Sequence, residues 1–278
     1  MNKLKIEALI KQLFSTSKEN YISDKYAISK DLVGVKMFDT PIMKIGNAKD
    51  PLFLKLKEPS GIGAHFLSLV EWLPQANSVL TFFFPLSKDV CESNKKIEIW
   101  PSSQWLHSRI EGQKFINEFI LSFQKEIRSK GYLSIVPSLD ERFWAKTEIN
   151  ASTAHPEASY TSNWSERHVA YICGLGTFGL SKGLITEKGM AGRLTSLITN
   201  LNVEPTVRKY NGIYDFCINC GACMKNCPVG AISERGKDHA ICSAFLNKTL
   251  DRYRPRYGCG KCQTSVPCEH KNPLFQLK

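Results

Sequence analysis

Four cysteines in the last quarter of the chain follow one another at a spacing that suits an iron–sulfur cluster. Cys217, Cys220, Cys223 and Cys227 form the pattern C-x-x-C-x-x-C-x-x-x-C-P, which ends at Pro228. In bacterial ferredoxins with this pattern, the first three thiolates bind one [4Fe–4S] cluster and the fourth thiolate binds a second cluster. The pattern therefore predicts single-electron transfer as the chemistry of this segment.

Four more cysteines follow downstream. If Cys227 serves a second cluster, three of them must complete that cluster and one remains for the first. We therefore predict two ligand sets: Cys217, Cys220, Cys223 and Cys268 for one cluster, and Cys227, Cys242, Cys259 and Cys262 for the other. The gap between Cys262 and Cys268 is longer than in a ferredoxin repeat. A single cluster with spare thiols therefore stays open, as does a zinc site built from C-x-x-C pairs.

Two cysteines lie outside these sets. Cys91 follows a strand-like segment, and Cys173 shares a helical face with Val169 and Ile172. Free cysteines among apolar neighbours behave as small hydrophobic residues. We expect both to be buried and inert.

A glycine-rich segment, Gly174-Leu-Gly176-Thr-Phe-Gly179, matches the pattern G-x-G-x-x-G. A dinucleotide site would need a strand before this pattern and a helix after it. Here residues 166–173 have helical spacing, and Gly183 interrupts any helix that follows. A nicotinamide site is therefore disfavoured. Two alternatives stay open: a loop whose backbone approaches another large, flat cofactor, with these three glycines as the binding residues, or a purely structural turn.

The elements that must position these residues alternate between helix and strand. Apolar spacing predicts helices near the N-terminus, over residues 1–14, and over residues 103–130. Runs of valine, phenylalanine and leucine predict strands over 33–38, 79–84 and 133–136. This mixture favours a layered α/β or α+β domain.

The composition changes near residue 205, which divides the chain into a predicted cofactor and substrate domain, 1–205, and a cluster domain, 206–278. The second part carries +7 of the formal net charge of +11. Eight thiolates around two oxidised clusters would contribute about −4. Much of the positive charge therefore balances the clusters, and it is weak evidence for nucleic-acid binding.

The remaining composition narrows the cellular setting. Ten cysteines would suit a secreted disulfide-rich protein only in a much shorter chain with an export signal. The longest apolar stretch, residues 79–86, is far shorter than the roughly 20 residues of a membrane span. We expect a cytoplasmic chain that does not associate with membranes.

Two segments resemble the epoxyqueuosine reductases. Residues 164–186, with Glu-Arg followed by Gly-Leu-Gly and a Leu-Ile strand, resemble the segment before the clusters in that family, and Cys259-Gly-Lys-Cys262-Gln-Thr resembles its second cysteine set. The related reductive dehalogenases share this layout. The resemblance covers residues 70–270. It implies an α+β fold class, with a nitroreductase-like, cobalamin-binding α/β domain followed by a ferredoxin-like module with two [4Fe–4S] clusters.

The chain departs from that family at positions that matter for the substrate. Tyr160 stands where epoxyqueuosine reductases have an aspartate thought to donate a proton, and Leu180 stands where they have a lysine. We expect no helical repeats of the kind that many members have, because ten residues follow Cys268. The epoxyqueuosine substrate is therefore not carried over. A tyrosine can donate a proton, but an ordinary turn aromatic is the favoured interpretation of Tyr160, and no catalytic residue is assigned. His168, among apolar neighbours, is expected to be a core histidine.

The resemblance implies an oxidoreductase that passes single low-potential electrons through two [4Fe–4S] clusters to a bound cobalamin, for reduction of a small organic or nucleoside substrate. The chain has no D-x-H-x-x-G sequence, so we expect a base-off cobalamin without a protein histidine on cobalt. A ferredoxin or flavodoxin is the expected electron donor. One alternative is a non-catalytic electron carrier or corrinoid activator for a partner protein. Another is a tRNA-directed enzyme of the epoxyqueuosine reductase type, suggested by the alternating cations and aromatics of residues 251–257.

Overall fold

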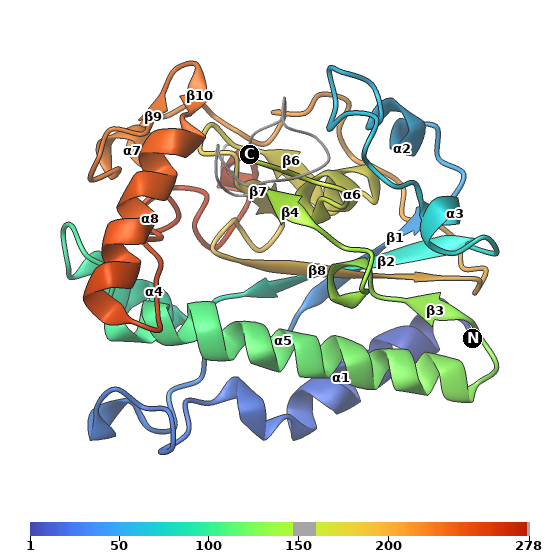
Figure 1. The fold of residues 1–278 in the computed structure, drawn as a ribbon, viewed down its shortest axis with the longest axis horizontal. Helices are drawn as coiled ribbons and strands as arrows, with labels where there is room; N and C mark the ends of the chain where they lie inside the picture. Colours follow the sequence, from blue (N-terminus) through green and yellow to red (C-terminus); the bar gives the residue numbers. More distant parts are fainter. Residues whose placement is uncertain (147–159, 277–278) are drawn as a thin grey trace.

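The computed structural model describes residues 1–146 and 160–276, and its centre is a four-stranded antiparallel sheet (Figure 1). The strand order is β1-β2-β8-β3. Strands β2 and β8 pair over their whole length, from Ser78 opposite Thr199 to Pro85 opposite Gly192. The strands are β1 (Ile42–Asn47), β2 (Ser78–Pro85), β8 (Gly192–Thr199) and β3 (Ser134–Ile135). The predicted strands over 79–84 and 133–136 are therefore present.

Strand β2 shows why the sheet is covered on both faces. Successive side chains of a strand point to opposite faces, and every residue of β2 is buried. Leu80, Phe82 and Phe84 belong to the core on one face, whereas Val79 and Phe83 belong to apolar clusters on the other. The result is a three-layer arrangement with helices on either side of the sheet.

Helices α5 (Ser103–Ser129) and α1 (Lys3–Thr16) cover the first face (Figure 1). Ser102 caps α5 by accepting a hydrogen bond from the backbone N–H of Trp105, and Gly131 follows its end with a φ of 83°. Three phenylalanines of α5 pack against the sheet edge-on, with Phe119 only 5.2 Å from Phe84 between ring centroids. Both predicted helices are confirmed.

Helices α6 (Glu166–Ile172), α2 (Leu52–Lys55) and α3 (Leu69–Trp72) lie on the opposite face. Phe66 and Trp164 stack there with their centroids 5.7 Å apart. Trp72 meets Trp164 edge-on at 6.1 Å. This aromatic cluster fixes the start of α6, which borders the candidate site.

The predicted strand over residues 33–38 is wrong. The segment makes only two isolated bridges, Tyr21 with Lys36 and Phe38 with Leu86. Its backbone donors are satisfied outside any sheet, because Asn20 accepts hydrogen bonds from Met37 through its carbonyl and from Phe38 through its side chain. A buried asparagine distant in sequence thus replaces a strand partner.

The elements after residue 205 contact the part of the chain that contains the four-stranded sheet. The backbone N–H of Met190 donates to the carbonyl of Cys268 at 2.8 Å, and Arg256 pairs with the buried Glu111 at 2.7 Å. The buried apolar residues of this part are few: Tyr210, Ala231, Ile232, Phe245 and Val266. Its elements are α7 (Ala222–Lys225), β9 (Ile232–Ser233), β10 (Gly236–Lys237), α8 (His239–Tyr253) and η4 (Pro273–Gln276).

The predicted mixed α+β fold is confirmed. The remaining elements are α4 (Lys88–Lys95), β4 (Ala145–Lys146), β5 (Thr161–Ser162), β6 (Gly176–Phe178), β7 (Leu184–Thr186) and the 3-10 turns η1 (Lys18–Asn20), η2 (Lys30–Leu32) and η3 (Pro137–Leu139). Within the described ranges, no helix is both long and apolar enough to cross a membrane.

Candidate functional site

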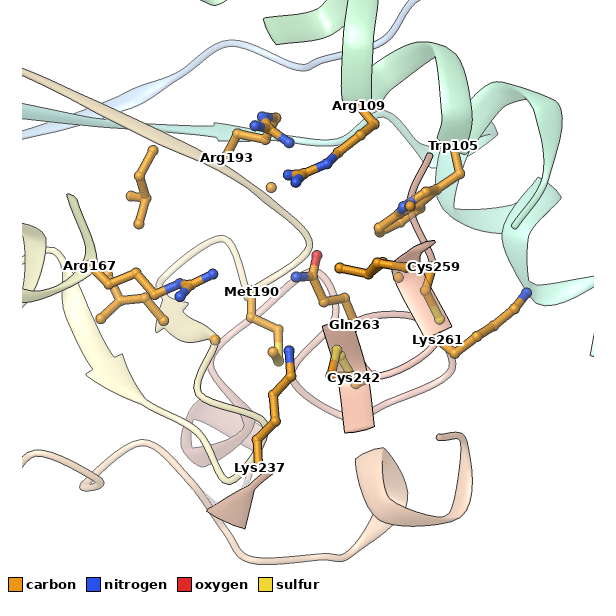
Figure 2. A pocket seen from close by; sticks show the side chains of 18 of the residues that line it. Trp105, Arg109, Arg167, Met190, Arg193, Lys237, Cys242, Cys259, Lys261 and Gln263 are labelled. Carbon is orange, nitrogen blue, oxygen red and sulfur yellow. The ribbon is translucent and has the colours of Figure 1, made fainter. Parts of the chain in front are cut away.

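Two cavities divide the eight C-terminal cysteines into two groups of four. The larger cavity, of about 450 Å³, is lined by Cys227, Cys242, Cys259 and Cys262, which we call the inner set (Figure 2). The smaller cavity is lined by Cys217, Cys220, Cys223 and Cys268, which we call the outer set because Cys220 is exposed at the surface. Each group contains the same cysteines as one of the ligand sets expected from the sequence. All eight are free thiols.

Local backbone geometry separates Cys227 from the three cysteines before it. Gly221 adopts a left-handed conformation with a φ of 71° and begins the short helix α7. Cys227 follows the end of this helix and faces the larger cavity, and the backbone N–H of Ala231 donates to its Sγ at 3.2 Å. The turn at Pro228 thus directs neighbouring cysteines into different cavities.

The thiols within each set influence one another electrostatically. Burial, followed by the nearby Cys217, raises the pKa of Cys268 to about 12. Burial, with Cys262 and Cys242 nearby, raises the pKa of Cys259 to about 12. Cys259 and Cys268 are therefore protonated at neutral pH without a bound metal, and metal binding would have to displace those protons. Between the sets, burial raises the pKa of Cys223 to about 11, and the nearby Cys262 adds to this effect.

The two remaining cysteines belong to neither cavity. Cys91 and Cys173 are completely buried, as their apolar neighbours predict. Burial raises the pKa of both thiols well above the ordinary value. Neither is placed to react with a ligand in the larger cavity.

The glycine segment forms a tight hairpin, and helix α6 precedes it. Its strands β6 and β7 pair from Gly176 opposite Thr186 to Phe178 opposite Leu184. A dinucleotide fingerprint needs the reverse order, with a strand before the glycines and a helix after them. Gly174 has a φ of 86° at the end of α6, and Gly179 lines the smaller cavity. A cofactor role for these three glycines stays a prediction.

Alanine substitutions separate a packing role from a ligand role. A Cβ at Gly176 would lie 2.0 Å from the backbone oxygen of Ile185, whereas one at Gly179 would first meet the flexible end of the Ile185 side chain at 3.2 Å. We expect Gly176→Ala to lower the free energy of unfolding by about 2 kcal/mol or more, measured by anaerobic thermal unfolding. Gly179→Ala is the matched control and should be nearly neutral. Equal stability of both variants, with equally weakened cofactor binding, would contradict the packing role.

Cationic side chains from separate elements extend into the larger cavity (Figure 2). Arg109 belongs to α5, Arg167 to α6, Arg193 to β8 and Lys237 to β10. Arg193 donates to the side-chain oxygen of Gln113 through two of its nitrogens. The sequence analysis missed this group. The sequence offers no signal for it, because these cations lie far apart along the chain.

The comparisons with known proteins agree with this geometry. A family model described as a 4Fe-4S binding domain matches residues 211–233. The epoxyqueuosine reductase of Listeria monocytogenes is 35% identical over an alignment of 118 residues. This alignment covers 38% of this chain and 30% of that protein. A solved selenomethionine-labelled epoxyqueuosine reductase superposes with a TM-score of 0.55 at 21% identity, over 96% of this chain and 66% of the other. A catabolic reductive dehalogenase in complex with 3-bromo-4-hydroxybenzoic acid superposes with a TM-score of 0.54 at 13% identity, over 98% and 37%.

The chain has the fold of the epoxyqueuosine reductase and reductive dehalogenase structural family, and it carries a 4Fe-4S binding domain. It spans about two thirds or less of the length of these relatives, since the matched part is 30% of the curated epoxyqueuosine reductase and 66% of the solved one.

Tyr160, where the epoxyqueuosine reductases are expected to have aspartate, has a left-handed backbone with a φ of 55°. Its ring lies 5.6 Å from that of His239 at the start of α8, and Tyr160 is not among the residues that line the larger cavity. His168 lies 2.7 Å from the hydroxyl of Ser165, and burial lowers its pKa to about 4. His168 is therefore a neutral, hydrogen-bonded histidine, but it is half-buried and not part of the buried core.

Glu166 also lines the larger cavity, but its carboxyl group is buried in the protein and does not face the cavity. Both of its carboxyl oxygens are buried, and neither has a hydrogen bond of good geometry within the described residues, although Ser196 and Ser138 lie nearby. Burial raises its pKa to about 7. The group is consequently at least half protonated at neutral pH and contributes little negative charge to the cavity wall.

This raised pKa predicts a pH-dependent stability. The unfolded carboxyl ionises near 4.5 and the folded one near 7, so the folded state holds the extra proton between these values. Glu166 should lower the free energy of unfolding by about 1.4 kcal/mol per pH unit as pH rises through this window. Glu166→Gln should remove this contribution in thermal unfolding measured from about pH 5 to about pH 8. Glu118→Gln, at an exposed position of α5, should keep the wild-type slope. Parallel slopes in all three proteins would contradict the assignment.

Proposed function

We propose that this chain is an iron–sulfur reductase that passes single low-potential electrons through two [4Fe–4S] clusters to a bound cobalamin, for reduction of a small organic or nucleoside substrate. The observation that carries the proposal is the division of eight cysteines into two groups of four, one of which borders a cavity of about 450 Å³. Sites for small molecules commonly have volumes of this order. An electron carrier alone would not need such a cavity.

The donor sets fit two clusters. Each cube takes four thiolates, and each cavity offers four free cysteines. The exposed Cys220 places the outer set at the surface, where an electron donor can approach. The inner set lines the larger cavity. Cys223 of the outer set and Cys262 of the inner set are close enough to interact electrostatically, so the two sets are neighbours. These positions support entry of electrons at the outer set and delivery from the inner set to the cavity.

The larger cavity also fits a flat cofactor beside the inner set. Leu184, Met190 and Leu194 supply an apolar wall, and the backbone of Gly192 and Gly260 borders the space. No histidine is among the described residues that line it, which is consistent with a cobalamin that has no protein histidine on cobalt. A bound cobalamin would supply a low-valent cobalt centre for two-electron reduction of the substrate. The chain itself would hold this cofactor, exclude water with its apolar wall and orient the substrate.

Cobalamin addition tests the proposal directly. The full chain is reconstituted anaerobically with iron and sulfide, and cobalamin is then titrated in while the visible spectrum is recorded. We expect one cobalamin per chain and a spectral change on binding, followed by reduction of the cofactor when dithionite reduces the clusters. A protein that carries both clusters but neither retains cobalamin nor alters its spectrum would overturn the proposal. Electron transfer only to a partner protein would favour the carrier or activator alternative.

A tRNA-directed activity gains little support from the basic residues between 251 and 257. Arg256 pairs with Glu111, and Arg252 lies over the ring of Trp100 at 4.8 Å. Tyr257 accepts a hydrogen bond from Arg109 at 3.0 Å. Arg252 and Arg254 are both exposed, and Arg254 pairs only with the nearby Asp251. Salt-sensitive retention of tRNA by the holoprotein would revive this alternative.

A further inference from the structure

Three arginines face the larger cavity without a carboxylate partner. Arg109, Arg167 and Arg193 form no ion pair with any described residue, whereas two partly buried arginines elsewhere in the chain do. Arg208, for example, pairs with Asp50, and Arg256 pairs with Glu111. The three cavity arginines come from α5, α6 and β8, so their convergence is a property of the fold and not of one local segment.

Their positive charges are close enough to oppose one another. Burial, and then the nearby Arg109 guanidinium, lowers the pKa of Arg193 to about 9. Burial also lowers the pKa of Arg167, and Arg109 adds to that effect. Arg109 and Arg193 are half-buried, and Arg167 is exposed at the cavity wall. Like charges gathered around one partly enclosed cavity are unfavourable unless an opposite charge compensates them. An arrangement that keeps three of them together therefore indicates a missing anion.

The neighbouring negative groups do not compensate all three. Glu166 is withdrawn from the cavity, with both carboxyl oxygens buried. The inner cysteines Cys262 and Cys242 act on Arg167, so a cluster there would balance part of its charge. They are not among the groups that act on Arg193, whose neighbours are Arg109, Tyr257 and Arg167. At least Arg109 and Arg193 remain without a counter-charge.

We propose that these three arginines bind an oxyanion, a carboxylate or phosphate group, of the substrate. The planar guanidinium offers paired donors that match both groups. Phe83 and Leu194, which line the same cavity, would contact the apolar remainder of the molecule. The inference rests on the proposed function, because it names the substrate class of that site: an anionic organic acid or nucleotide and not a neutral compound.

Binding of simple anions tests this inference. The holoprotein with both clusters loaded is titrated by calorimetry with inorganic phosphate and, separately, with benzoate. We expect Arg167→Gln and Arg193→Gln each to raise the dissociation constant by about tenfold or more. Arg193→Lys, which keeps the charge but not the paired donors, should fall between wild type and Arg193→Gln. Arg254→Gln, which removes the same charge at a surface position 68% exposed, is the matched control and should bind as wild type does.

The phosphodiester of cobalamin is a second possible source of the oxyanion, and cobinamide, which lacks it, separates the two. If Arg167→Gln and Arg193→Gln weaken cobalamin binding but leave cobinamide and the simple anions unaffected, the arginines hold the cofactor and the substrate inference is overturned. It is also overturned if neither phosphate nor benzoate binds to wild type, or if the cavity variants and Arg254→Gln bind alike. Iron content and the cobalamin spectrum are recorded on the same samples. If the samples do not hold two clusters or do not bind cobalamin, but still bind the simple anions, the proposed function is overturned and the oxyanion site is retained.

Discussion

Replacing Cys262 by alanine should remove one cluster and leave the other in place. The inner set would lose a ligand, while Cys217, Cys220, Cys223 and Cys268 of the outer set remain complete. We expect the iron content of anaerobically reconstituted protein to fall from about eight to about four atoms per chain. Cobalamin reduction should stop at the same time, because the remaining cluster would not adjoin the larger cavity. Iron and sulfide analysis with electron paramagnetic resonance measures both effects.

The same experiment distinguishes the crossed assignment from a sequential one. Cys227→Ala should behave as Cys262→Ala does and lose the inner cluster, although Cys227 is adjacent in sequence to the outer cysteines. Cys268→Ala should instead match Cys217→Ala and lose the outer cluster. Cys91→Ala, at a buried position outside both sets, is the control and should keep about eight irons. If Cys227→Ala lost the cluster that Cys217→Ala loses, the crossed assignment would be wrong.

Much of the fold was predictable because its signals are local. Ser102 and Gly131 mark the ends of α5, and the continuous apolar run of β2 is typical of a strand covered on both faces. The segment 33–38 was mispredicted because its hydrogen-bond partner is Asn20, which no periodicity of the segment reveals. The placement of β8 between β2 and β3 is likewise set by long-range pairing.

The candidate site likewise has one part that the sequence predicts and one part that it does not. The cysteine sets could be anticipated because a short turn with Gly221 and Pro228 determines where each thiol points. The arginine group could not, because Arg109, Arg167 and Arg193 lie in three segments that only the three-dimensional fold brings to one cavity. Spacing rules recognise ligands that share a loop. They do not detect side chains that converge from a helix, a second helix and a strand.

Removing the iron should unfold much of the C-terminal part while the sheet persists. Every residue of the three apolar clusters lies before residue 204, so the sheet-containing part has its core within itself. Residues 206–274 bury few apolar side chains. Their folded state must then depend on the clusters and on contacts such as Arg256 with Glu111. For small domains of this kind, the free energy of metal binding largely supplies the free energy of folding.

Hydrogen exchange measures this dependence on both parts of one sample. After chelation under anaerobic conditions, amides of α8 (His239–Tyr253) should lose protection by about a thousandfold or more, whereas those of α5 (Ser103–Ser129) should keep theirs and serve as the internal control. Reconstitution with iron and sulfide should restore α8. Unchanged protection of α8 in the iron-free protein would contradict the prediction. It would mean that the buried ion pair and the hydrogen bonds of Lys261 to the carbonyls of Asn94 and Ile97 hold this part together without metal.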